Sequence, residues 1–172
     1  MTALFDLMGK HDVTAERTER LRLYVSPACY AAYANRRAFS GKWEASASIH
    51  YTAAVTLHDR ALWMEQFERY DDPKLRHFAA ERIDLIGDPK LTAEQARVEA
   101  HLKDGTVLSA TCMASKGTPE NPLTRAEIEE KFRRAAAGRL KEAQVPVVLD
   151  AISGLEDQRS VRPLMDALSA PH

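Results

Sequence analysis

His50 stands in the most polar setting among the residues that could take part in chemistry. Ser48 and Tyr51 flank it in a stretch otherwise dominated by small side chains. A histidine beside hydroxyl groups can bind a polar ligand and exchange a proton with it. We therefore predict that Ser48, His50 and Tyr51 bind substrate. The alternative is a structural histidine that is hydrogen-bonded within the fold, which is the commoner arrangement.

The remaining histidines and the cysteines form no recognisable metal-binding pattern. No two histidines have the i,i+4 spacing with an intervening glutamate that is typical of a helical zinc site. Cys29 and Cys112 are isolated, so they form neither a CxxC pair nor a disulfide framework. The sequence therefore predicts no metal site. The histidines considered are His11, His50, His58, His77, His101 and His172.

Known nucleophile and phosphate-binding signatures are absent, but two arginine pairs could bind anions. The nucleophile elbow, the glycine-rich phosphate loop and HExxH do not occur. Residues 36–37 and 133–134 are Arg-Arg pairs, and guanidinium groups bind carboxylates bidentately. For residues 133–134 the alternative is stronger, because Glu129 and Glu130 have the i,i+4 spacing of ordinary helical ion pairs.

The composition indicates one ordinary soluble domain. The 172 residues contain 24 Lys and Arg against 25 Asp and Glu, whereas nucleic-acid-binding surfaces need a clear basic excess. No apolar run reaches the length needed to cross a membrane, and the first residues lack a signal-peptide pattern. We therefore expect a cytoplasmic protein with neither a nucleic-acid nor a membrane partner.

The first half of the chain reads as helices with two strands. We predict that the aromatic stretch 29–42, which contains Tyr30, Tyr33 and Phe39, is a loop, and a protein interface is as good an interpretation of it as a ligand site. The expected elements are a short helix near residues 4–8, a strand over 21–25, a helix over 44–58, a helix around 62–70, a helix starting at Asp72 and a strand over 83–86.

The second half begins with a hairpin and ends with helices. Alternating residues 98–103 lead to the turn Asp104-Gly105, and residues 107–113 form the returning strand. Thr124 and Glu127 form a capping box for a helix that begins a helical tail over 124–170. The chain is therefore predicted to be an α+β domain, in which helices pack on a roughly four-stranded, mostly antiparallel sheet.

Several segments, taken in order, resemble the carboxy-terminal half of the MmgE/PrpD family. This family includes 2-methylcitrate dehydratase, cis-aconitate decarboxylase and iminodisuccinate epimerase. Residues 41–51, GKWEASASIHY, resemble the family stretch G-x-E-A-K-F-S-x-x-Y. The hairpin turn at 104–105 and the run 117–123, GTPENPL, followed by 131–133, KFR, are the most specific matches.

The resemblance implies that residues 1–172 are a single domain like the family's smaller, lid-like domain. In the family, the larger helical domain carries the catalytic acid and base, so no catalytic residue transfers to this chain. Ser46 and Ala47 stand where the family usually has Lys-Phe, which is a departure from its pattern.

The resemblance implies a small subunit or lid of a lyase or isomerase that acts on a small polycarboxylate. Its partner would be a larger helical catalytic subunit, or else a second copy in a homo-oligomer. The reaction would be a dehydration, a decarboxylation or an epimerisation, and it would need neither a cofactor nor a metal. The alternatives are a non-catalytic binding or dimerisation domain derived from the lid, and a piece of a longer reading frame. Exposed apolar area on residues 44–58 and on the last helices is expected to form the joint with the larger subunit.

Overall fold

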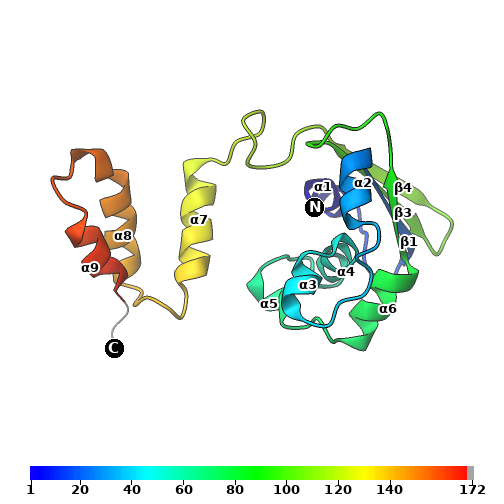
Figure 1. Ribbon diagram of the computed structural model, residues 1–172, viewed down its shortest axis with the longest axis horizontal. Helices are drawn as coiled ribbons and strands as arrows, with labels where there is room; N and C mark the ends of the chain where they lie inside the picture. The colour runs from blue at the N-terminus through cyan, green and yellow to red at the C-terminus, as the bar shows by residue number, and fades with distance from the viewer. Residues whose placement is uncertain (170–172) are drawn as a thin grey trace. The chain divides into compact units, whose positions relative to one another are not determined.

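The computed structural model describes residues 1–169 and divides into two compact units, residues 1–121 and the residues from Pro122 onward. The first unit contains a four-stranded sheet in the order β2-β1-β3-β4 (Figure 1). β1 and β2 are parallel, whereas the other two pairings are antiparallel. The predicted α+β class with a mostly antiparallel sheet is confirmed. The strands are β1 (Thr18–Val25), β2 (Ile83–Gly87), β3 (Ala96–Leu102) and β4 (Val107–Cys112).

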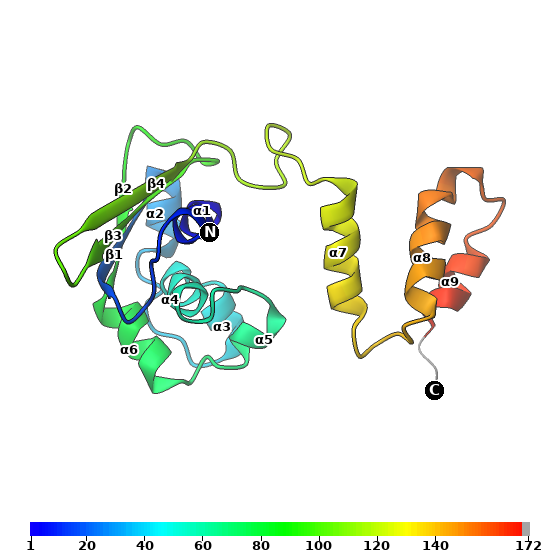
Figure 2. The same ribbon diagram turned by 180° about the vertical axis from the view of Figure 1, so that it is seen from behind.

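The helices of this unit cover one face of the sheet (Figure 2). α1 contacts β3 and β4, while α2, α4 and α6 contact β2. Within residues 1–121, no helix covers the opposite face (Figures 1 and 2). The helices are α1 (Thr2–Lys10), α2 (Pro27–Tyr33), α3 (Lys42–Ser46), α4 (Ile49–Asp59), α5 (Met64–Phe67) and α6 (Pro73–Glu81).

The main core lies between the covered sheet face and helices α1 and α4. Alternating side chains of β1, including Leu21 and Leu23, point into it, as the two-residue period of a strand requires. Leu4 of α1 and Leu57 of α4 pack against them and are only 1% exposed. α4 is buried on nearly every side, because small residues such as Ala53 let neighbouring elements approach closely.

The uncovered sheet face is mostly polar and carries paired charges on β1, β2 and β3. Arg20 of β1 donates to the Asp84 carboxylate of β2 at 2.9 Å. Tyr24 of β1 donates its hydroxyl hydrogen to Glu99 of β3 at 2.9 Å. Arg97 forms an ion pair with Glu99 and stacks on the Tyr24 ring, with its guanidinium carbon 3.6 Å from the ring centroid. This face is therefore charged but locally balanced.

The prediction of a loop over residues 29–42 is wrong for its first part, because α2 occupies Pro27–Tyr33. Pro27 ends the strand, as predicted, but it also occupies the first turn of the helix, where its missing N–H costs nothing. The Ser26 side chain caps this helix by accepting a hydrogen bond from the backbone N–H of Cys29 at 3.3 Å.

The predicted helix over residues 44–58 is broken into α3 and α4. Ser48 has an extended backbone, with φ −95° and ψ 116°, and its side chain caps α4. A serine side chain can form hydrogen bonds with nearby backbone groups in place of the helical ones. At Ser48 this bonding separates α3 from α4 and caps the start of α4. The helix near residues 62–70 shrinks to the short α5, whereas the helix capped by Asp72 and the hairpin with its turn at Gly105 are confirmed.

The second unit consists of short helices. Thr124 and Glu127 form the predicted capping box. Ser160 accepts from the backbone N–H of Arg162 at 3.2 Å, one residue before the cap position of the last helix. Residue 170, where the predicted tail ends, lies outside the described residues. The helices are α7 (Arg125–Ala136), α8 (Gln144–Ser153), the 3₁₀ helix η1 (Leu155–Asp157) and α9 (Arg162–Leu168).

Candidate functional site

Ser48, predicted to bind substrate, is buried and makes structural hydrogen bonds. It is 1% exposed. Its hydroxyl donates to the backbone carbonyl of Arg36 at 2.5 Å and accepts from the backbone N–H of Tyr51 at 3.2 Å. Ser48 therefore joins the first turn of α4 to the segment that follows α2.

Tyr51 lies in a second, smaller core cluster. Its hydroxyl donates to the backbone carbonyl of Gln66 at 2.5 Å, and its ring contacts Phe39 edge-on at a centroid distance of 5.0 Å. Burial raises the pKa of Tyr51 to about 12, although Arg69 acts in the opposite direction. The phenol is therefore neutral at physiological pH and anchors α5 to α4.

His50 is fully buried, and neither of its ring nitrogens makes a hydrogen bond of normal geometry within residues 1–169. Burial, together with a smaller contribution from the Arg37 guanidinium, lowers the pKa of His50 to about 4, while the Arg36 backbone carbonyl and Asp84 act in the opposite direction. The imidazole is therefore neutral at physiological pH. Ser48, His50 and Tyr51 share one helical turn inside the unit, and their role in substrate binding stays a prediction.

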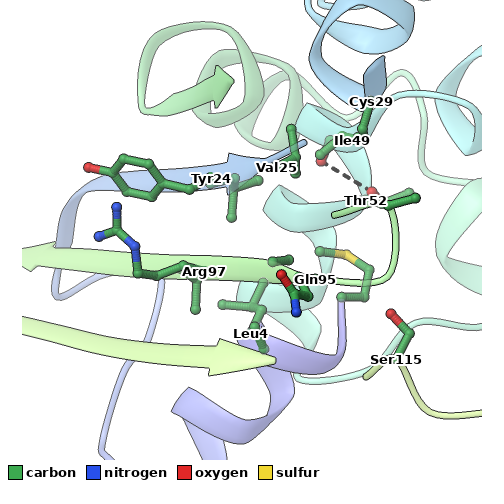
Figure 3. A pocket seen from close by; sticks show the side chains of 15 residues that line it. Leu4, Tyr24, Val25, Cys29, Ile49, Thr52, Gln95, Arg97 and Ser115 are labelled. Carbon is green, nitrogen blue, oxygen red and sulfur yellow. Dashed lines mark hydrogen bonds between the residues drawn. The ribbon is translucent and has the colours of Figure 1, made fainter. Parts of the chain in front are cut away.

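An apolar pocket lies at one end of the sheet, beside α1 and the start of α4 (Figure 3). It has a volume of about 190 Å³. Leu4, Val25 and Ile49 form part of its apolar wall. Thr52 also lines it, but its hydroxyl donates to the carbonyls of Ser48 and Ile49 at 3.0 and 3.1 Å, so it is already satisfied. This pocket suits an apolar group rather than an anion.

The arginine pair at residues 36–37 splits into two different roles. Arg37 donates to the backbone carbonyl of Ala80 at 2.9 Å and thereby ties its segment to α6. The Arg36 guanidinium has no hydrogen-bond or ion-pair partner within residues 1–169, and its carbon lies 5.0 Å from the centroid of the Tyr33 ring. Arg36 lines an open hollow of about 420 Å³ next to α3.

The pair at residues 133–134 lies on α7, in the second unit. There Glu129 pairs with Arg125, at 2.8 Å, so the expected pairing of Glu129 with Arg133 is not the one formed. His101, on the uncovered sheet face, lies 3.6 Å from the Glu99 carboxylate. Both sites are ordinary charged surfaces.

A family model decides the wider relationship of the chain. The model of the MmgE/PrpD C-terminal domain matches residues 1–157. The chain belongs to the MmgE/PrpD family. A search of curated proteins found no match. The matched region of this MmgE/PrpD domain includes the whole first unit and, in the second, α7, α8 and η1.

The described part of this MmgE/PrpD domain lacks two features, a metal-binding cluster and a membrane-spanning helix. Residues 1–169 contain no cluster of three or more His, Cys, Asp and Glu side chains that could hold a metal ion. Over the same residues, every helix is too short or too polar to cross a membrane.

The sequence analysis predicted neither the apolar pocket nor the hollow beside Arg36 in this MmgE/PrpD domain. The apolar pocket is assembled from α1, α4 and the ends of two strands, so no local pattern marks it. The hollow beside Arg36 had one available signal, which is Trp43 in the polar stretch 40–46. Trp43 is 73% exposed, an unusual state for the largest apolar side chain.

Proposed function

We propose that this chain is the small subunit or lid domain of an MmgE/PrpD-type lyase or isomerase that acts on a small polycarboxylate and is not catalytic alone. The observation that carries the proposal is the match to the C-terminal domain of the family, over residues 1–157. The burial of His50 agrees with the proposal, because an imidazole that is 0% exposed in this chain is not accessible to act as the catalytic acid or base by itself. A larger helical subunit would supply the acid and the base.

The second unit offers the surface for that larger subunit. Its last helices carry apolar side chains with no covering layer within residues 122–169: Val147 is 55% exposed, Ile152 is 47% and Met165 is 58%. Buried apolar area drives association, so these faces favour a helical partner. Residues 49–58, expected to contribute to the joint, lie instead inside the first unit, with exposed apolar area nearby at Trp43 of α3.

The proposed chemistry needs neither a metal nor a redox cofactor. A base removes a proton next to a carboxylate, and either a leaving group departs or the carbon is reprotonated on its other face. Our chain would close over this site and exclude water, which strengthens interactions between the charged substrate and its binding groups. We place the reaction in the cytoplasm, where Cys29 and Cys112 stay reduced.

Co-purification with the products of neighbouring genes tests this function. We expect a stoichiometric larger helical protein, and we expect the complex to convert polycarboxylates while the isolated chain does not. The double variant Val147→Glu, Met165→Glu should lose this partner, because it places charges in the apolar joint. Glu130→Gln, an exposed change on α7, is the matched control and should retain it.

The same apolar face also favours an alternative function. A second copy of the chain could cover it, which would make the protein a non-catalytic dimerisation or binding domain derived from the lid. A homo-oligomer that brings down no larger protein and is inert towards polycarboxylates would support this alternative and contradict the enzyme subunit.

A further inference from the structure

The hollow beside α3 combines a guanidinium that has no ion-pair partner within residues 1–169 with an exposed aromatic ring. It lies between the segment that follows α2 and α3 itself. None of Ser48, His50 and Tyr51 lines it. The residues that do are Asn35, Arg36, Ala38, Trp43, Glu44 and Ala47.

Arg36 is held in place without being neutralised. Its backbone carbonyl accepts the Ser48 hydroxyl hydrogen bond at 2.5 Å, and its guanidinium carbon lies 5.0 Å from the centre of the Tyr33 ring. By contrast, Arg20 and Arg69 each pair with an aspartate. An unpaired guanidinium on a fixed backbone loses little freedom when it binds a carboxylate through two parallel hydrogen bonds.

Trp43 supplies the apolar part of the hollow. Its side chain is 73% exposed, so a flat hydrocarbon group can lie against the indole. Ala38 and Ala47 line the same hollow with single methyl groups, which leaves space beside the ring. The hollow therefore suits a ligand in which a short carbon skeleton follows directly from a carboxylate.

Glu44 limits how much negative charge the hollow accepts. Its carboxylate accepts hydrogen bonds from the Ser40 backbone N–H at 2.7 Å and the Ser40 hydroxyl at 2.8 Å. These bonds lower the pKa of Glu44, so the group is ionised at neutral pH. Its charge opposes a second anionic group at this end of the ligand.

We propose that this hollow binds one carboxylate group of a small organic di- or tricarboxylate, with Arg36 holding the carboxylate and Trp43 covering the adjacent carbons. The inference deepens the proposed function and rests on it for the choice of substrate class. It assigns Arg36, and not the neighbouring Arg37, as the residue of this chain that contacts the anion.

The test is a titration of the isolated full-length chain with tricarballylate, in which binding is monitored through the NMR signal of the Trp43 indole N–H. Trp43→Phe identifies that signal by its loss. We expect a saturable shift with tricarballylate and none with its neutral triamide, while the Trp63 indole signal stays in place. No saturable shift at the Trp43 indole would overturn the proposal.

Three variants separate the subsite from a general charge effect. Arg36→Gln should weaken binding about tenfold, because it removes a charge-assisted hydrogen bond. Arg37→Gln removes the same charge from a side chain bound to the Ala80 carbonyl, and it should leave the affinity unchanged. Glu44→Gln should tighten binding about two- to threefold, since it removes an opposing surface charge. Equal losses in Arg36→Gln and Arg37→Gln would overturn the assignment.

Failure of the subsite and failure of the proposed function give different experimental results. If the complex converts polycarboxylates but Arg36→Gln binds tricarballylate as well as the unaltered chain, the subsite is wrong and the function stands. If the chain binds tricarballylate through Arg36 but no partner or turnover is found, the subsite stands and the enzyme function is wrong.

Discussion

The two units of this chain differ sharply in how much apolar surface they enclose. Residues 1–121 bury a continuous core from α1, α4 and the sheet. In the described part of the second unit, the buried apolar side chains are Ala136, Val145 and Val148 alone. Small units with little core are rarely stable without further support. The contrast predicts that the first unit folds by itself, whereas the second gains stability when another surface covers it.

The largest expected effect comes from separating the two units. A fragment of residues 1–121 should unfold cooperatively, because its core is complete, whereas a fragment of residues 122–172 should show little helix and no cooperative transition. Far-ultraviolet circular dichroism during heating measures both. A cooperative transition in the 122–172 fragment would remove the contrast between the units.

Single truncations should sharpen the same comparison. Leu57→Ala removes a side chain that is 1% exposed and should lower the free energy of unfolding of the first unit by about 3 kcal/mol. Ile152→Ala removes one that is 47% exposed and should change stability by no more than about 0.5 kcal/mol. Urea unfolding of the full chain measures both values. Similar losses in the two variants would show that α8 is covered after all.

His50 should make the stability of the first unit depend on pH. Its pKa is about 4 in the folded chain against an ordinary value of 6.5, so the unfolded chain binds a proton that the folded chain does not. The stability contribution is therefore complete above pH 6.5 and is lost as the pH falls towards 4. His50→Leu should flatten this slope, which urea unfolding at several pH values measures. His58, whose pKa burial also lowers, should retain part of the slope.

Thr124→Ala should have an effect that is confined to the second unit. The change removes the side-chain cap of α7 and should cost that helix about 1 kcal/mol. Backbone chemical shifts of residues 125–136 should move towards coil values, while the thermal transition of the first unit stays in place. A lowered transition in the first unit would mean that the two units are energetically coupled.

Local signals explain which parts of the fold the sequence could predict. The strand containing Leu21 and Leu23, the hairpin with Asp104-Gly105 and the cap at Thr124 depend on neighbouring residues, and each prediction is confirmed. The break at Ser48 was missed because the apolar spacing continues through it, and only its bond to the Arg36 carbonyl distinguishes a cap from a mid-helix serine.

The candidate site was less predictable because it depends on long-range packing. The polar residues around His50 predicted a pocket, but in the fold they face inward or satisfy backbone groups. The sequence does not distinguish Arg36 from Arg37. In the structure, the Ala80 carbonyl accepts a hydrogen bond from Arg37 and not from Arg36. Family resemblance supplied what local patterns could not, namely the identity of the whole domain.

The parallel pairing of β1 with β2 has a consequence for the order of folding. The β3–β4 hairpin closes a short turn, whereas Leu21 must find Ile83 after the whole crossover of residues 26–82 has been made. Distant pairings form more slowly, because the entropy of loop closure must be overcome before their contacts are gained. Arg36 and Trp43 both lie within that crossover. We therefore expect the β1–β2 pair, which closes the crossover that carries the hollow, to form later in folding than the β3–β4 hairpin.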